Sequence, residues 1–104
     1  MKILWLELAE EDVESIYQFY AKDKSIKAAN RIYNDILDAT DSFADFPQMA
    51  SIEPELSDGE EEYRSLVVRK HFKIIYFIES DSVYIAAVWD YRQNPQTNVS
   101  KIRP

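Results

Sequence analysis

The chain has 104 residues and a formal net charge of −7, and it contains no Cys, one Gly and one His. This length corresponds to one domain, which can bury a hydrophobic core of its own. The lack of Cys excludes disulfides, thiolate metal ligands and a Cys nucleophile. Because Gly59 is the only glycine, Gly-rich phosphate loops and dinucleotide-binding fingerprints are excluded as well.

The first half of the chain predicts a strand and two helices. Residues 2–6 form a short apolar run, which predicts a strand. Over residues 9–21, apolar side chains recur at helical spacing, and acidic residues occupy the first turn, where the helix dipole favours negative charge. Ser25 predicts the N-cap of a second helix over residues 26–44, and Pro47 ends that pattern.

The second half predicts a loop followed by three strands. Residues 47–62 hold two prolines, the only glycine and a run of three glutamates, which is typical of a loop. Strands are predicted over 63–68, 72–79 and 82–89, with a hairpin turn at 79–82. The order βααβββ predicts an α+β domain. Long apolar runs in the last two strands predict that they are central and covered by the helices on at least one face.

No segment approaches the ~20 apolar residues of a membrane span. Residues 1–7 (MKILWLE) lack the long apolar region and the small-residue cleavage site of a signal peptide. We therefore expect a soluble, cytoplasmic protein. One His and no Cys argue against a transition-metal site, and no cofactor is expected.

Charge is unevenly distributed along the chain. Residues 1–62 carry five Lys and Arg against sixteen Asp and Glu, whereas residues 63–104 carry seven against three, a net of +4. A positive segment in an acidic protein indicates a phosphate-bearing or acidic partner.

Several segments together resemble the RelE/ParE toxins of bacterial type II toxin–antitoxin modules. They are listed here in chain order: residues 9–17 (AEEDVESIY), 43–47 (FADFP), 63–68 (YRSLVV), 72–76 (FKIIY) and 83–92 (VYIAAVWDYR). No single segment is diagnostic, but their order and spacing are fairly specific, and the resemblance extends from Ile3 to Pro95. It implies a twisted antiparallel sheet with an N-terminal strand and two helices packed against it.

The resemblance is nearer to ParE and implies a toxin of the plasmid-stabilisation type. Such a toxin inhibits a macromolecular target such as DNA gyrase and is neutralised by a cognate antitoxin. Two alternatives stay open. One is a RelE-type endoribonuclease, which cleaves mRNA on the ribosome without a metal. The other is a degenerate member that binds only its antitoxin.

The resemblance also implies which residues would carry the nuclease chemistry. Arg64, Lys73 and Arg92 fall where the RelE group has basic catalytic residues. Lys73 replaces an arginine, so phosphate would not be held in a bidentate manner. The segment 97–104 lacks the tyrosine that RelE-type enzymes use, and Tyr91 is the only substitute nearby. This incomplete set favours target inhibition over catalysis.

For a target-binding surface we predict seven residues: Arg64, Arg69, Lys70, His71, Lys73, Tyr91 and Arg92. The alternative is that the charged residues are solvated strand-edge positions and that His71 is an ordinary turn residue. If the surface exists, antiparallel pairing should bring Arg64, Lys73 and Arg92 onto one concave face.

The strand-rich segment carries many apolar side chains for a thin domain with helices on one side. We therefore expect exposed apolar sheet surface, which would make the isolated chain dimeric or prone to aggregation. The antitoxin would cover it, contacting a groove beside residues 63–68 and the apolar helix faces.

Overall fold

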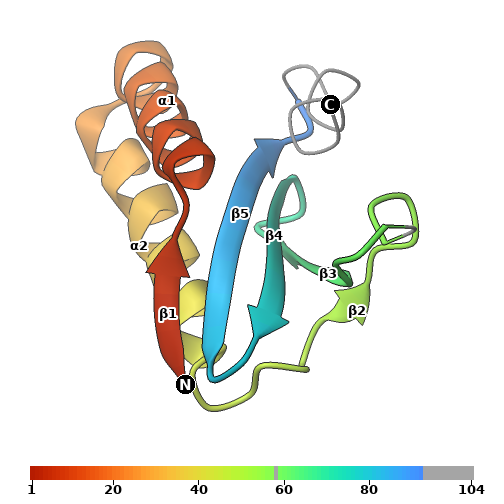
Figure 1. Cartoon of the computed structure of the whole chain (residues 1–104). Helices are drawn as coiled ribbons and strands as arrows, with labels where there is room; N and C mark the ends of the chain where they lie inside the picture. The colour runs from red at the N-terminus through yellow and green to blue at the C-terminus, as the bar shows by residue number, and fades with distance from the viewer. Residues whose placement is uncertain (58, 93–104) are drawn as a thin grey trace.

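The computed structural model describes residues 1–57 and 59–92, and Figure 1 shows a helical hairpin packed on one face of a sheet. The elements are β1 (Lys2–Trp5), α1 (Glu7–Asp23), α2 (Ile26–Ser42), β2 (Ser51–Ile52), β3 (Tyr63–Val68), β4 (Phe72–Glu79) and β5 (Ser82–Asp90). The predicted elements are confirmed, with bounds that differ by two residues or fewer. The predictions for segment 97–104 and for the last residues of the resemblance concern positions outside the described residues.

The strands lie in the order β1-β5-β4-β3-β2. The antiparallel pairing of β3, β4 and β5 is confirmed, and β4 and β5 are central as predicted. The sheet as a whole is mixed, which refines the expected antiparallel sheet, because β1 pairs in parallel with β5. These two strands come from opposite ends of the chain. Their relative direction follows from how the intervening helices pack, which hydrophobic periodicity does not report.

A correction concerns the predicted loop over residues 47–62, because it contributes the short strand β2. Ser51 and Ile52 pair with Ser65 and Arg64 of β3. Two residues with flanking prolines and acids give no usable alternation pattern, so only the neighbouring strand reveals this element.

The main core lies between the helices and the sheet. The helices bury most of the apolar stripes that their spacing predicts, but Ile26 and Tyr33 of α2 are exposed. Ser25 caps α2 by accepting a hydrogen bond from the Ala28 backbone N–H at 3.0 Å. From β4, alternate residues point to this side, as expected of a strand with period two. The largest buried contributors are Tyr20, Ile32, Ile36, Phe43, Phe72, Ile74 and Tyr76.

The opposite face of the sheet has its own smaller core, where Leu56 from the 53–57 loop packs with Ile75, Phe77 and Trp89. These side chains are buried, so the expected exposure of apolar sheet surface is wrong for β4 and β5. The reason is that the loop predicted over 47–62 folds across that face. The exposed apolar side chains lie elsewhere, chiefly at Met1, Leu4, Leu6, Phe19, Ile26, Tyr33, Phe46, Met49, Ile52 and Val67.

Candidate functional site

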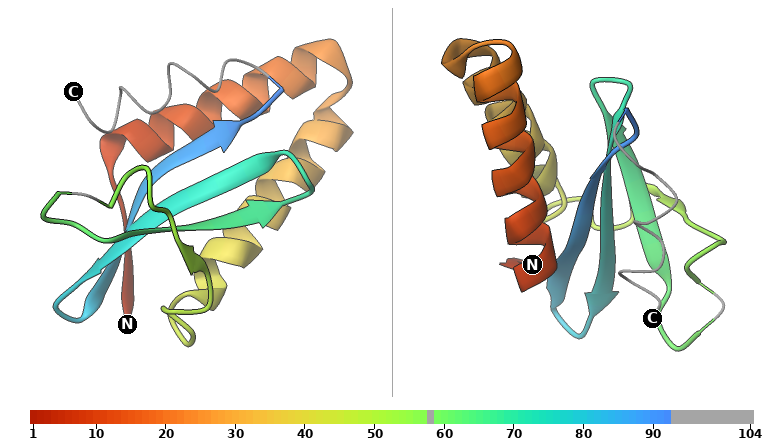
Figure 2. Two further views of the ribbon diagram at one scale, coloured as in Figure 1. Left: turned by 90° about the vertical axis from the view of Figure 1, so that its right-hand side faces the viewer. Right: turned by 90° about the horizontal axis from the view of Figure 1, so that it is seen from above.

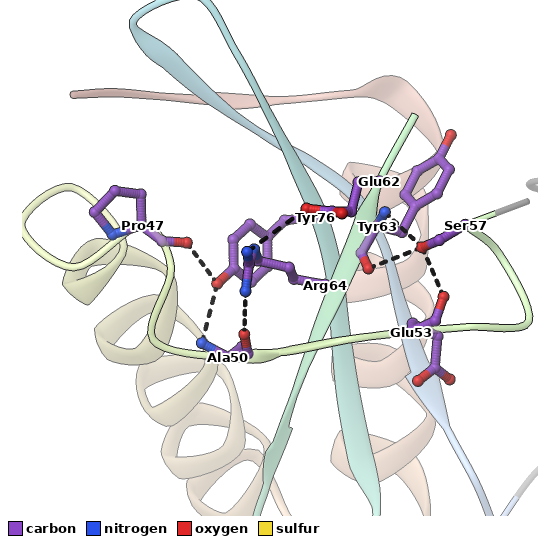
Figure 3. A network of polar contacts seen from close by, with 8 residues as sticks. All are labelled: Pro47, Ala50, Glu53, Ser57, Glu62, Tyr63, Arg64 and Tyr76. Carbon is purple, nitrogen blue, oxygen red and sulfur yellow. Dashed lines mark hydrogen bonds and ion pairs between the residues drawn. The ribbon is translucent and has the colours of Figure 1, made fainter. Parts of the chain in front are cut away.

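Arg64 of β3 is placed to hold the 47–50 segment against the sheet. Its Nη1 donates to the Ala50 carbonyl oxygen at 2.8 Å, and its Nη2 lies 3.6 Å from the Glu62 carboxylate. The side chain is only 16% exposed. Figure 3 shows the guanidinium directed at the loop backbone and at Glu62. Arg64 is therefore engaged within the protein and is not an open phosphate ligand.

Tyr76 of β4 completes this network from inside the core. Its hydroxyl donates to the Pro47 carbonyl at 2.8 Å and accepts a longer bond, 3.4 Å, from the Ala50 N–H, as Figure 3 shows. Its ring stacks on Phe43 with centroids 3.9 Å apart. Burial raises the pKa of Tyr76, while the bond to Ala50 and the charge of Arg64 oppose the shift. The hydroxyl thus stays protonated and anchors the chain after α2.

Lys73 of β4 is engaged in a similar way by a different partner. Its Nζ lies 3.0 Å from Glu53, whose other carboxylate oxygen accepts a hydrogen bond from the Ser65 hydroxyl at 3.2 Å. The ammonium also lies 5.0 Å from the centre of the Tyr91 ring. Burial alone would lower the pKa of Lys73, but hydrogen bonds to Tyr91 and Glu53 and the charge of Glu53 outweigh it and raise that pKa.

The predicted convergence of Arg64, Lys73 and Arg92 on one concave face is wrong. Arg64 is opposite Tyr76 in the β3–β4 register and shares its helix-facing side, whereas Lys73 is opposite Val67 and Trp89 and points to the other side. Side chains one residue out of phase along a strand point to opposite faces. Arg92 contacts Tyr20 on the helix side. This contact lies about 13 Å along β4 from the Arg64 position, because four residues with a rise of ~3.3 Å each separate the two places.

The turn between β3 and β4 presents three of the predicted target-binding residues. Arg69 and Lys70 have positive φ angles of 53° and 71°, a region that disfavours residues with a Cβ by about 1 kcal/mol or more each. Arg69 is held by Asp35 of α2 at 2.6 Å. Burial lowers the pKa of His71, and the charge of Arg92 lowers it further.

Beside this turn, a polar cluster closes the end of β5. The Tyr20 hydroxyl donates to a carboxylate oxygen of the buried Asp90 at 2.7 Å, and the Arg92 guanidinium donates to the Tyr20 oxygen. The other Asp90 oxygen accepts the Arg92 backbone N–H at 3.0 Å. Burial, followed by the bond to Asp90, raises the pKa of Tyr20. Tyr91 points away from this cluster, toward Trp89 and Lys73.

A groove of about 850 Å³ runs beside β1 and the helical hairpin. Its lining comes from three elements: Ile3, Leu4 and Trp5 of β1, Glu10, Val13, Glu14, Tyr17 and Gln18 of α1, and Asn30, Tyr33 and Leu37 of α2. Across it, the Tyr17 hydroxyl donates to the Asn30 side-chain oxygen at 2.7 Å. Among the described strands β1 lies at the edge of the sheet, so none of them pairs with the outer side of its backbone. This groove lies beside the edge of the sheet opposite residues 63–68, where an antitoxin contact is predicted from the sequence.

Sequence reasoning missed Glu53, Tyr76, Tyr20 and Asp90 as partners of the predicted cations. Glu53 lies in a segment expected to be a solvated loop, and Tyr20 lies 70 residues from Asp90. The one available signal was that Tyr76 and Asp90 are polar groups within long apolar strands, where a buried polar group needs a partner.

Within residues 1–57 and 59–92, no group of three or more His, Asp or Glu side chains is placed to hold a metal ion. In that same part of the chain, neither helix has the length and apolar composition needed to cross a membrane.

The family described as ParE toxin of the type II toxin–antitoxin system, parDE, matches residues 3–95. The chain belongs to this ParE toxin family. A solved structure described as the chromosomal ParDE TA system from P. aeruginosa matches the ParE-family fold seen here with a TM-score of 0.72 at 18% sequence identity. The match covers 86% of this chain and 95% of that chain, and at this identity it shows the fold alone. Among curated proteins, none matches the sequence.

Membership of the ParE family confirms the resemblance stated from the sequence. It identifies the chain as a toxin of a type II toxin–antitoxin system, and such a system implies an antitoxin partner. The target of the toxin is a separate question, which the placement of the cations addresses.

Proposed function

We propose that this ParE-family toxin inhibits DNA gyrase by binding to it, and that it does not cleave RNA. The observation that carries the proposal is the internal engagement of Arg64 and Lys73 on opposite faces of the sheet. Cleavage at a phosphate needs cations that converge on the developing negative charge. Two cations that are separated by the sheet and already bonded to Ala50 and Glu53 do not provide such a site.

We further propose that the cognate antitoxin neutralises the toxin by seating a segment in the groove beside β1. The floor of the groove is apolar and aromatic, and Glu10 and Glu14 supply negative charge at its lining. A segment with apolar side chains and Lys or Arg residues would be complementary to it, and the unpaired edge of β1 could add a strand. A gyrase inhibitor of this kind would act in the bacterial cytoplasm.

The target is tested by inducing expression of the chain in bacteria and measuring plasmid supercoiling and mRNA integrity separately. We expect loss of gyrase supercoiling with intact mRNA. Cleaved mRNA with normal supercoiling would instead support the RelE-type alternative. An effect on neither would support a degenerate member that binds only its antitoxin. Purified gyrase with and without the chain gives the matching measurement in solution.

The antitoxin site is tested by thermal melting with the product of the adjacent gene. A ligand at a hundred times its dissociation constant stabilises the folded state by about 2.7 kcal/mol, so the toxin should melt at a higher temperature. Tyr33→Lys, in the groove, should reduce this shift, whereas Phe46→Lys, at an exposed apolar position outside the groove lining, should preserve it. Equal shifts for both variants would place the antitoxin elsewhere. Sedimentation of the isolated chain tests the expected dimer.

A further inference from the structure

The topology gathers three distant segments at one end of the molecule. These are the turn between α1 and α2, the turn between β3 and β4, and the end of β5, as the two views in Figure 2 show. Side-chain contacts tie them together: Arg69 with Asp35 at 2.6 Å, and Tyr20 with Asp90 at 2.7 Å. We define the basic end as residues 18–35, 69–71 and 90–92.

Positive charge is concentrated at the basic end. It carries seven Lys and Arg against three Asp, a net of +4. The other described residues carry three Lys and Arg against fifteen Asp and Glu, a net of −12. Four of the seven cations, Lys22, Lys24, Lys27 and Arg31, belong to the half of the sequence that is acidic overall. Over the same described residues, the sequence divides into −10 for residues 1–62 and +2 for residues 63–92. The folded molecule is therefore more strongly polarised than the linear sequence.

The acids at the basic end neutralise only part of this charge. Asp35 is paired with Arg69, and Asp90 is bonded to Tyr20 and to the Arg92 backbone. Asp23 lies 4.0 Å from Lys24, and both side chains are more than half exposed, so this pair is weak. Across the part of the chain that the structure describes, no carboxylate comes within 4.0 Å of Lys27, Arg31 or Lys70.

The exposed cations are arranged for a repeating anionic partner. Lys27 and Arg31 are four residues apart on α2, about 6 Å along the helix axis at ~1.5 Å per residue. Duplex DNA presents about one negative charge per 1.7 Å of its axis.

We infer that the basic end binds the phosphate backbone of duplex DNA held by gyrase, an inference that rests on the proposed function. The acidic remainder of the molecule is repelled by DNA, so only this end can face the duplex. Affinity for free DNA is correspondingly modest, and gyrase supplies the remaining contacts. Lys70 has a positive φ angle, a backbone conformation that disfavours residues with a Cβ. A lysine in this conformation is consistent with a functional constraint.

The test measures binding of a fluorescent 20-base-pair duplex to the purified chain by anisotropy over a range of salt concentrations. The variants are Lys27→Gln, the triple variant Lys24→Gln/Lys27→Gln/Lys70→Gln, and the matched control Lys2→Gln, which removes one exposed cation outside the basic end. Each lysine lost from a phosphate contact should reduce the salt slope by about one. We expect several-fold weaker binding for Lys27→Gln, a larger loss for the triple variant and no change for Lys2→Gln.

Three results of this binding assay would overturn the inference: no salt-dependent binding of the unaltered chain, an unchanged salt slope in the triple variant, or an equal loss of affinity with Lys2→Gln.

Gyrase supercoiling assays on the same variants separate this inference from the proposed function. If the chain inhibits gyrase and the triple variant inhibits equally well, the DNA contact is wrong and the gyrase target stands. If the chain binds DNA through the basic end without inhibiting gyrase, the gyrase target is wrong and the DNA surface stands. Weaker binding of the triple variant to gyrase without DNA would assign the surface to an acidic protein patch and overturn the DNA contact.

Discussion

Arg64 and Lys73 of the sheet differ in their surroundings from three cations of the basic end. Arg64 and Lys73 have side chains 16% and 17% exposed, and each holds a loop segment through a carbonyl or carboxylate. Lys27, Arg31 and Lys70 are exposed, and no carboxylate of the described residues lies within 4.0 Å of them. Whether a cation is available for function therefore depends on the acceptors that the fold places around it. Its sequence neighbourhood and its place in a family pattern do not decide this.

The largest effect should come from Lys73→Ala. It leaves Glu53, whose side chain is only 15% exposed, without its cation. Removing one partner of a buried pair costs about 3–5 kcal/mol, and the residual exposure should reduce this to roughly 2–3 kcal/mol. Chemical denaturation measures the loss. Adding Glu53→Gln should recover part of it, because the unpaired charge is then removed. A Lys73→Ala variant as stable as the original chain would show that this cation is not structural.

Arg64→Ala should have the next largest effect. It leaves the Ala50 carbonyl without its donor and removes the stem that packs beside Tyr76, at a cost of about 1–3 kcal/mol. For a domain of this size that loss lowers the melting temperature by roughly 4–8 °C per kcal/mol. An exposed Arg64 in a shared basic site would instead give a loss of toxicity with little loss of stability. If the Arg64→Ala variant lost toxicity but melted at an unchanged temperature, that interpretation would be restored. The contrast between engaged and exposed cations would then fail for Arg64.

His71 gives a smaller, pH-dependent effect at the basic end. Its pKa is lowered in the folded state by burial and by Arg92, so the unfolded chain binds the proton more readily. Stability should therefore be complete above the ordinary His pKa of about 6.5 and fall as the pH drops below it. Denaturation at pH 7.5 and 5.5 measures the loss, and His71→Gln should flatten that part of the profile. An unaltered profile in the variant would assign the dependence to other groups.

The smallest effect is expected from Lys70→Asn. Asn tolerates positive φ better than Lys, so the substitution should leave stability unchanged or raise it by a few tenths of a kcal/mol. Thermal melting measures the change, and Lys27→Gln, in a helix, serves as the control with an expected change within about 0.5 kcal/mol. A loss above 1 kcal/mol for Lys70→Asn would show that Lys70 has a structural role like that of Lys73.

The sequence by itself determined the helices, the three main strands and their antiparallel order, because hydrophobic periods of 3.6 and two are local properties of the chain. It also determined the family, because the matching segments and their order can be recognised without any knowledge of contacts. The N-cap at Ser25 and the burial of Trp89 follow from the same local rules.

Only the tertiary structure decided the direction of β1, the face to which each cation points and the partner that each one meets. Glu53 reaches Lys73 across 20 residues and Asp35 reaches Arg69 across 34, distances over which sequence periodicity carries no information. The basic end likewise exists only after folding, because its cations come from both halves of the chain. Charge is a property of each residue, but its availability depends on long-range packing, and that packing separates the structural cations from those left for a partner.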